Sequence, residues 1–544
     1  MRVKLVFLPK CPVDPNLRTQ FSNEIGFPPL GIATLTSFLK KHGIKVSQDD
    51  LDVKVVYTNW KFAGTEKSIN LTYFLDEKKR KKVIKDNEET LEKEAEKILR
   101  LTKWRNFDII GFSVQSPDNP SAVTIAITLA KLLKEKYDVP VIAGGCMNDY
   151  AIKTLLEGGF VDCVLLSSHF GSLGEVNLLK FCEMYEKGVE FHKIPGVIYL
   201  DKEKVIYTRR FEDYEVKERR IFTLPDFDGL SMELYQYKVF SKTNGNVYKS
   251  KILILPYFFI YGCPNTCAFC NYSRYPLLGV KNPEDVARDL KILSKKYHTK
   301  YFYFLNPEIN VTKEYAYQVA KQIIKEGLEI KWTDCATFKN MDVKLLEILK
   351  EAGASRLVWG LESASQRMLN YIQKGIKLED AKKILKKSYQ IGIFNHILLI
   401  CGFPYEREHD INLTISFLKE NKEYITGGTT LNKFWIDGLF EDNPEKYGLH
   451  LKEHTKNYRD WSTRPFDELK GLSWEQKVKI VPKLFEILRK TIEQLGLRGE
   501  IPIHIIFHFK DLEDSDIKIV PKIGINFQKY KNLYSVTFNE KVFD

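Results

Sequence analysis

Three closely spaced cysteines are the residues in this chain with the clearest capacity for chemistry. Cys263, Cys267 and Cys270 lie in the stretch Tyr-Gly-Cys-Pro-Asn-Thr-Cys-Ala-Phe-Cys, with the spacing C-x3-C-x2-C. Three thiolates on one short loop, bent by Pro264 and Asn265, can bind three irons of a 4Fe–4S cluster. The fourth iron would then be open to a substrate or a cofactor. The spacing therefore predicts a cluster with a catalytic role.

A structural zinc site is the main alternative interpretation of the same cysteines. Structural zinc normally takes four protein ligands, and the next forty or so residues offer only His298 as a further Cys or His. The whole chain has 9 cysteines in 544 residues, so three at this spacing are a distinctive feature. Cys335 and Cys401 lie outside the triplet and are interpreted as small core residues.

Length and composition indicate a globular protein with more than one domain. A chain of 544 residues exceeds one ordinary core, and 44% hydrophobic with 28% charged residues is typical of globular proteins. The longest apolar run, Ile252 to Tyr261, is shorter than the roughly 20 residues of a membrane span. The N-terminus reads as a strand without a cleavable signal, so a cytoplasmic location is expected. The net charge of +12 comes from interspersed acids and bases, a pattern that does not favour nucleic-acid binding.

The first 210 residues alternate short apolar strands with helical patterns, as in an open parallel α/β sheet. A helix is predicted after Pro28-Pro29, because proline is favoured at helix starts. The strands predicted in this part are Val3 to Leu8, Lys45 to Val56, Asp108 to Ser113, Val139 to Gly145 and Val161 to Leu165. Residues 211–245 are interpreted as a connector.

A second α/β series is predicted over residues 246–438, and the cysteine loop follows its first strand. Further strands are expected at Tyr301 to Leu305, Ile330 to Thr333, Arg356 to Gly360, His396 to Cys401 and Lys433 to Ile436. In a parallel β/α barrel, active-site groups collect at the carboxyl ends of strands. Polar or glycine-rich turns follow three of these strands: Asn306 to Asn310, Gly360 to Ser363, and Cys401 to Pro404. Residues 439–544 form a separate C-terminal region with a long helix near Trp474 to Leu495.

These motifs, in this order, give residues 245–435 a resemblance to the radical S-adenosylmethionine (SAM) family. The resemblance implies a partial (β/α)6 barrel in which the cysteines hold a 4Fe–4S cluster and the open iron chelates SAM. It assigns Phe269 to the aromatic position near the adenine, and Asn306 and Glu308 to the segment that binds the SAM amino group. The usual Gly-Gly-Glu of that segment is not literally present. The resemblance also assigns contacts with SAM to Glu362, Ser363 and Gly402, and Lys374-Gly375 matches a frequent family pattern.

The N-terminal half resembles the Rossmann-like cobalamin-binding domain that precedes many radical SAM domains. The resemblance implies that the following residues contact cobalamin: Pro29, Leu30, Ser113, Gly144 and Gly145. Asp-x-His-x-x-Gly is absent, so no histidine is offered as a lower cobalt ligand. After Leu165 the family's Gly-Glu-Gly-Glu is replaced by the longer segment from Leu166 to Glu175, in which Glu175 recovers part of the motif.

The resemblance implies an α/β enzyme, a cobalamin-dependent radical SAM methyltransferase that acts on an unactivated carbon. The expected partners are a low-potential electron donor, such as flavodoxin or ferredoxin, and a substrate that is a peptide, a lipid or a small molecule. The C-terminal region, including Trp435, Asp437 and residues 443–447, is expected to enclose the substrate. The alternatives are cyclisation, rearrangement or carbon–carbon coupling without methyl transfer, and a cluster-containing nucleic-acid-binding or sensor protein. No catalytic residue is assigned.

Overall fold

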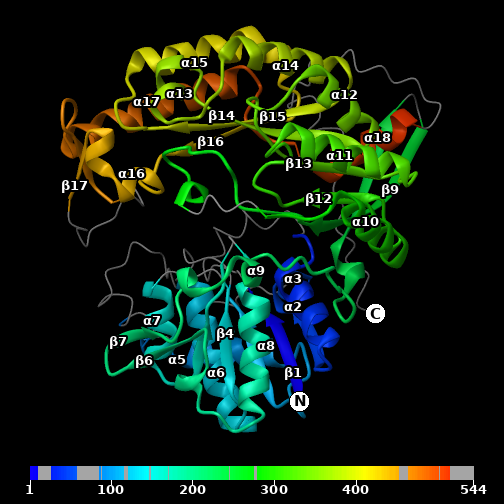
Figure 1. Cartoon of the computed structure of the whole chain (residues 1–544), viewed down its shortest axis with the longest axis vertical. Coiled ribbons are helices and arrows are strands. Elements are labelled where there is room, and N and C mark those ends of the chain that lie inside the picture. Colours follow the sequence, from blue (N-terminus) through cyan, green and yellow to red (C-terminus); the bar gives the residue numbers. More distant parts are fainter. Residues whose placement is uncertain are drawn as a thin grey trace. The chain divides into compact units, whose positions relative to one another are not determined.

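The computed structural model describes residues 1–9, 26–57, 82, 85–86, 88–114, 120–145, 149–168, 171–243, 246–274, 279–452, 464–501 and 503–514. Within these residues the chain forms two compact units, and the boundary lies between Tyr235 and Gln236 (Figure 1). Both units are α/β. No helix in the described ranges is long and apolar enough to cross a membrane.

The first unit is built on a seven-stranded sheet with the order β2-β1-β3-β4-β5-β6-β7. Its parallel strands are β1 (Arg2–Phe7), β2 (Lys45–Asp50), β3 (Ile109–Ser113), β4 (Val141–Gly144) and β5 (Cys163–Leu165). The hairpin β6 (Val197–Asp201) and β7 (Lys204–Tyr207) extends the sheet in antiparallel fashion. The apolar residues of β1, β3 and β4 are almost fully buried, as expected for parallel strands that are covered by helices.

Helices of the first unit form two groups. α2 (Leu30–Lys41) packs against α8 (Leu173–Tyr185). α5 (Glu88–Leu99) packs against α6 (Pro120–Tyr137), which packs against α7 (Asp149–Glu157). A continuous core joins α5, α6 and α7 to one face of the sheet through residues such as Phe112, Leu129 and Leu155.

Two segments of the first unit differ from the sequence-based expectations. The strand predicted over Lys45 to Val56 ends at Asp50, and α3 (Leu51–Tyr57) begins there. The Asp50 carboxylate accepts hydrogen bonds from the backbone N–H groups of Asp52 (2.8 Å) and Val53 (3.1 Å), which stabilises the helix start. Residues 211–235, expected in a connector, belong to this unit. Tyr214 is buried there and donates to Asn177 at 2.6 Å.

The second unit is built on an eight-stranded sheet with the order β19-β16-β15-β14-β13-β12-β9-β8. Six neighbouring strands are parallel: β9 (Asn246–Tyr257), β12 (Tyr301–Phe304), β13 (Lys331–Ala336), β14 (Ala354–Glu362), β15 (Phe394–Cys401) and β16 (Gly428–Lys433). β8 (Gln236–Thr243) and β19 (Gly499–Glu500) pair antiparallel at the two edges. The predicted alternation of strands and helices is therefore present.

Helices follow the strands of this sheet and cover one side of it. They are α10 (Pro283–Tyr297), α11 (Lys313–Lys325), α12 (Val343–Glu351), α13 (Gln366–Tyr371), α14 (Leu378–Gln390) and α15 (Glu408–Asn421). Figure 1 shows α14 and α15 running along the outer side of β14, β15 and β16. Because every parallel strand returns through a helix, all six carboxyl ends lie at one edge of the sheet. That edge carries the cysteine loop and the polar turns.

The last strand predicted in this series is displaced. It was expected at Lys433 to Ile436, but β16 spans Gly428–Lys433. Its start carries the pair Gly427-Gly428, which is more typical of a turn, and a Cβ at Gly427 would lie 2.9 Å from the backbone of Asn395. The close approach of two strands therefore requires glycine where the sequence pattern suggests a loop. Phe434 and Ile436 follow the strand and enter an apolar cluster with Phe403.

The described C-terminal elements pack on both ends of the second sheet. α16 (Leu439–Asp442), β17 (Leu449–Leu451), β18 (Phe466–Glu468) and α17 (Trp474–Gln494) follow β16. α18 (Ile503–Asp514) contacts β8, β9 and β14, and His504 stacks on Tyr237 at 4.2 Å between ring centroids. Residues 453–463, which include Trp461, and the chain after Asp514 lie outside the described residues.

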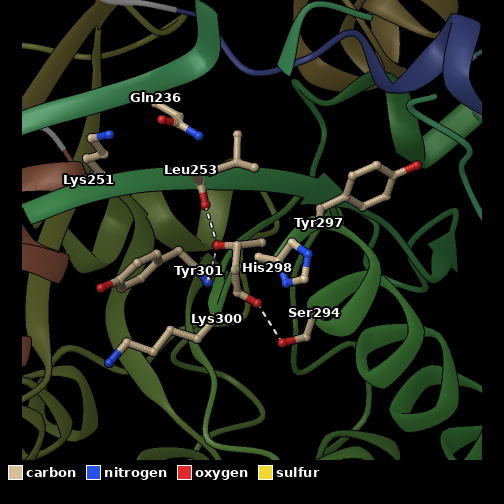
Figure 2. A pocket seen from close by; sticks show the side chains of 9 residues that line it. Gln236, Lys251, Leu253, Ser294, Tyr297, His298, Lys300 and Tyr301 are labelled. Carbon is tan, nitrogen blue, oxygen red and sulfur yellow. Dashed lines mark hydrogen bonds between the residues drawn. The ribbon is translucent and has the colours of Figure 1, made fainter. Parts of the chain in front are cut away.

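A cavity of about 560 Å³ lies near the amino end of β12 (Figure 2). It is lined by Gln236, Lys251, Leu253, Ser294, Tyr297, His298, Thr299, Lys300 and Tyr301. The Ser294 hydroxyl donates a hydrogen bond to the backbone carbonyl of Thr299, and the Thr299 hydroxyl donates to that of Leu253. This cavity is at the opposite end of the strands from the cysteine loop, so it is separate from the candidate site.

Gly145, which follows β4, gives a direct test of the first unit. It has φ +127°, and a Cβ there would lie 2.3 Å from the carbonyl oxygen of Val114. We expect Gly145→Ala to lower the free energy of unfolding by about 2 kcal/mol more than Gly159→Ala. Gly159 is the matched control, because it also has positive φ (+67°) but a Cβ there would meet no atom within 4 Å. Urea unfolding, with hydrogen exchange in β3 and β4, measures the difference. Equal losses of unfolding free energy in the two variants would contradict the account.

Candidate active site

The cysteine loop follows the carboxyl end of β9. The short strands β10 (Ile260–Tyr261) and β11 (Gly279–Val280) pair with each other on either side of the loop. Within it, the N–H of Cys270 donates to the carbonyl of Cys267 at 3.1 Å, and the N–H of Ser273 donates to the carbonyl of Cys270 at 3.0 Å. Cys263 and Cys267 are both 8% exposed, and Cys270 is half-buried. Hydrogen-bonded turns therefore hold the three thiols on one compact loop.

The three thiols share one electrostatic environment. Burial raises the pKa of Cys263 to about 12, and Glu308 and the other two thiols contribute to the rise. Burial also raises the pKa of Cys270 to about 11, while a backbone hydrogen bond from Tyr272 opposes the shift. The pKa of Cys267 is raised by burial, and Lys374 opposes that shift. Since a thiolate is the form that binds metal, these cysteines need a positively charged group to stabilise their ionised form.

The donor set fits an iron–sulfur cluster. Three sulfurs from one loop can serve three irons, and each thiolate is stabilised by the iron that it binds. In the described ranges, no three Cys, His, Asp or Glu side chains converge on a single ion position.

Glu308 faces the cysteine loop from the turn after β12. Its Oε1 accepts a hydrogen bond from Asn265 Nδ2 at 2.6 Å and lies 3.6 Å from Cys263 Sγ. Asn265 Oδ1 in turn accepts from Lys339 Nζ at 3.2 Å. Burial raises the pKa of Glu308, and Lys374 opposes the shift. The Glu308 carboxylate is thus fixed beside the loop, where it can contact a cationic group such as an amine.

Asn306, in the same turn, has a different environment. Its Oδ1 accepts from the N–H of Phe259 at 3.0 Å, and its Nδ2 donates to Asp334 at 2.7 Å. Asn306 and Asp334 are both buried. The Asn306 side chain therefore joins the ends of β9, β12 and β13, and it supports the turn on which Glu308 lies.

Glu362 ends β14 in an uncommon backbone conformation. It has φ +66°, directly after an irregularity in the pairing of β14 with β15. Its Oε1 accepts from Lys374 Nζ at 3.0 Å, and both side chains are nearly buried. A Cβ on Gly360 would lie 2.8 Å from each of these two polar atoms, so a larger residue there would displace the ion pair. Strained backbone of this kind is a frequent feature of functional sites.

Lys374 connects the Glu362 side of the site to the cysteine loop. Although burial opposes the shift, Glu362 and Cys267 raise the pKa of Lys374 above its ordinary value, so the side chain is charged. Its Nζ also lies 5.6 Å from the ring centroid of Phe269, within cation–π range. Lys374 is therefore a cation that acts on both the Cys267 thiol and the Glu362 carboxylate.

Phe269 and Gly402 belong to one apolar corner. The Phe269 ring meets Phe403 edge-to-face at 5.4 Å between centroids. Gly402 has φ +102°, and its N–H donates to the buried carboxyl of Glu406 at 2.6 Å. Burial raises the pKa of Glu406 to about 7. Ser363 is 1% exposed and its Oγ accepts from the N–H of Ser365 at 3.2 Å, so it serves the local turn.

The candidates in the first unit lie at the carboxyl end of its sheet. Ser113 and Gly144 end the adjacent strands β3 and β4 and are register partners. Pro29 and Leu30 start α2, and the N–H of Ala33 donates to the carbonyl of Pro29. Gly145 exchanges two hydrogen bonds with Ser167 Oγ, which ties the turn after β4 to the segment after β5.

The altered segment from Leu166 to Glu175 is partly described, because His169 and Phe170 lie outside the described residues. Glu175 is 7% exposed in the first turn of α8, and burial raises its pKa to about 7. A Cβ on Gly171 would lie 2.7 Å from the carbonyl oxygen of Arg219. The segment is thus packed closely against later chain. Cys401 is fully buried, and Cys335 is half-buried.

Several residues of the site had no local signal in the sequence. Lys339, Glu406, Glu468 and Lys477 all act on the cysteine loop or on the turn after β15. Their partners are mostly distant in the sequence; for example, Lys339 is 74 residues from Asn265. Only the fold brings such pairs together, so spacing within a motif cannot reveal them.

The Lys374–Glu362 pair is testable by a double-mutant cycle. We expect Lys374→Met to reduce the free energy of unfolding by about 3 kcal/mol, because it leaves a buried carboxylate without its cation. Adding Glu362→Gln to this variant should restore part of the loss. Urea unfolding, with hydrogen exchange in β14, measures both effects. If the single and double variants were equally stable, the two side chains would not be coupled.

Comparisons with known proteins show what this chain is similar to. Residues 257–418 match the model of the radical SAM superfamily. An uncharacterized methyltransferase of Pyrococcus horikoshii, PH0819, is 28% identical over 75% of this chain and 83% of its own length. The anaerobic magnesium-protoporphyrin IX monomethyl ester cyclase of Rubrivivax gelatinosus is 22% identical over 62% of this chain and 59% of its own.

A solved structure shares the fold. It is the radical SAM methyltransferase TsrM of Kitasatospora setae with cobalamin and a [4Fe-4S] cluster bound, with a TM-score of 0.56 and 14% identity, covering 91% of this chain and 88% of that one. The match of the superfamily model begins at Tyr257 and includes the cysteine loop, Glu308, Glu362 and Gly402. The chain is therefore an enzyme with a radical SAM domain over residues 257–418, and it shares the fold of TsrM.

Proposed function

We propose that this protein is a cobalamin-dependent radical SAM methyltransferase that acts on an unactivated carbon. The observation that carries the proposal is the arrangement of the cysteine loop, with Glu308 at 3.6 Å from Cys263 Sγ and the Glu362–Lys374 pair close enough to influence Cys267. Methyl transfer is supported by the similarity to PH0819 and to the fold of TsrM, both of which are methyltransferases.

Each group of this site has a role in the proposal. Cys263, Cys267 and Cys270 hold the 4Fe–4S cluster, and Glu308 and Asn306 lie on the turn that receives the amino group of SAM. Glu362 and Ser363 would contact the ribose or the amino acid moiety, and Phe269 and Gly402 would contact the adenine. When bound, the cluster supplies the electron that splits SAM into methionine and a 5′-deoxyadenosyl radical, and cobalamin supplies methyl transfer.

The proposal includes the domain layout. The first unit is the cobalamin-binding domain, with Pro29, Leu30, Ser113, Gly144 and Gly145 near the corrin. The parallel strands β9 to β16 form the partial (β/α)6 barrel of the radical SAM domain, and the region after β16 helps to enclose the substrate. A low-potential flavodoxin or ferredoxin delivers the electron. A reducing compartment such as the cytoplasm would keep the thiols available for iron.

Cyclisation without methyl transfer is the second candidate. The observation that favours it is the 22% identity to the R. gelatinosus cyclase, which covers 59% of that protein. Both candidates share the cluster and the cleavage of SAM, so they differ only in the product. A binding or sensor protein without catalysis is incompatible with turnover of SAM, so an assay of SAM cleavage and an analysis of products together distinguish all three.

The cluster assignment is testable by single substitutions. We expect Cys263→Ala, Cys267→Ala and Cys270→Ala to lose most of the iron of the anaerobically reconstituted protein, because each removes one iron ligand. Release of 5′-deoxyadenosine from SAM under reducing conditions should be abolished. Cys182→Ala is the matched control, since it removes a buried cysteine of α8 in the first unit. Normal iron content and SAM cleavage in the three loop variants would refute the assignment.

Methyl transfer is testable with SAM that carries an isotope in its methyl group. The protein is purified anaerobically with cobalamin supplied, and we expect a corrin absorption spectrum at about one equivalent per chain. Candidate peptide, lipid and small-molecule substrates are then incubated with labelled SAM, and products are analysed by mass spectrometry. Label in a product supports methyl transfer, whereas an unlabelled product with a new ring or bond supports the cyclase alternative.

A further inference from the structure

The turn from Gly402 to Tyr405, directly after β15, is held by buried polar side chains. The N–H of Gly402 donates to Glu406 Oε2 at 2.6 Å, and the N–H of Tyr405 donates to Glu468 Oε1 at 2.6 Å. Lys477 Nζ donates to the carbonyl of Phe403 at 3.4 Å and to Glu468 Oε1 at 2.6 Å. Backbone groups of the turn are thus bound by side chains in place of water.

Two of these side chains come from the C-terminal region. Glu468 ends β18 and Lys477 lies in the first turns of α17, and they are 63 and 74 residues from their partners in the turn. Their side chains are 0% and 3% exposed. The start of α17 is fixed by a capping box between Ser473 and Gln476, which sets the direction of Lys477.

Stability alone does not explain why the Glu468–Lys477 ion pair is buried. Buried ion pairs contribute little net stability compared with apolar residues of similar volume. Glu468 also accepts hydrogen bonds from Arg407 and from the N–H of Leu472. Although burial opposes the shift, Arg407 and Lys477 lower the pKa of Glu468 to about 2. An ionised acceptor with defined partners fixes geometry, which an apolar side chain cannot do for backbone N–H groups.

The turn itself has a backbone that requires such support. Gly402 has φ +102° and Tyr405 has φ +60°, and the second value is unusual for a residue with a side chain. Strained conformations persist where the surroundings determine them fully. The Tyr405 hydroxyl donates to the carbonyl of Gly448 at 2.7 Å, which adds a third fixed point from the C-terminal region.

The other side of the turn contacts the cysteine loop. Phe403 meets Phe269 at 5.4 Å and Phe434 at 5.1 Å between ring centroids. Phe269 lies in the sequence between the second and third cysteines of the triplet. A displacement of the turn would therefore move the aromatic corner beside the cluster ligands.

We propose that Glu468 and Lys477 are positioning residues for SAM: they hold the Gly402–Tyr405 turn in the conformation that receives the adenine. The inference rests on the proposed function, because it takes SAM as the ligand of this corner. It makes the segment from β18 to α17 a part of the SAM site, whereas the sequence pattern predicts only a substrate-enclosing role for the C-terminal region.

The test compares SAM binding by full-length, cluster-reconstituted variants. We expect Lys477→Met and Glu468→Gln to weaken SAM binding about tenfold, since each removes a charged hydrogen-bond partner of the turn. The KM for SAM in 5′-deoxyadenosine release should rise by a similar factor, with kcat nearly unchanged and iron content equal to that of the wild type. Lys477→Arg keeps the cation and should retain more affinity than Lys477→Met.

Arg489→Met is the matched control, because it removes a partly exposed cation of the same helix whose ion-pair partners are Glu486 and Glu493. Wild-type affinity in the Glu468 and Lys477 variants, or a loss of affinity that merely parallels a loss of iron, would overturn the inference. Failure of the radical SAM part of the proposed function is distinguishable, since the wild-type protein would then neither bind nor cleave SAM, whereas failure of methyl transfer alone would change only the product.

Discussion

The need to ionise three buried thiols is the constraint on which the rest of this site depends. Burial alone raises the pKa of the loop cysteines, and Glu308 raises that of Cys263 further. The charge of bound iron can offset this cost, and Lys374 contributes from the protein side. Because their pKa values are raised, the cysteines of this loop are poorly suited to exist as free thiolates. The loop is suited to a cofactor that brings its own positive charge.

The fold meets this constraint by placing complementary charges at one edge of a parallel sheet. Glu308, Glu362 and Lys374 come from three different turns, yet each influences the pKa of Cys267. A hydrogen bond from Asn265 fixes the Glu308 carboxylate, and one from Lys374 fixes the Glu362 carboxylate. Gly360 leaves room for the Glu362–Lys374 pair. The carboxylates can therefore face a cationic ligand without a change in the backbone. A pre-formed arrangement of this kind reduces the cost of binding.

Sequence reasoning succeeded where the signal was local and failed where it depended on tertiary packing. The cysteine spacing, the alternating strands and helices, and the polar turns after β12, β14 and β15 were all visible in short segments. The predicted strand extended beyond the end of β2, because the apolar residues after Asp50 resemble a strand in the sequence. In the structure, Asp50 caps a helix there. The displaced β16 begins at glycines that serve a close strand contact. Glu468 and Lys477 could not be found, since their partners lie more than 60 residues away.

The central claim is that the fourth iron of the cluster is open and binds SAM. Electron paramagnetic resonance of the reduced, reconstituted protein, recorded with and without SAM, tests it most directly. The account predicts a 4Fe–4S signal whose g-values shift when SAM is added, because the amino and carboxylate groups of SAM become ligands of the open iron. A cluster signal that is unchanged by saturating SAM would contradict the account.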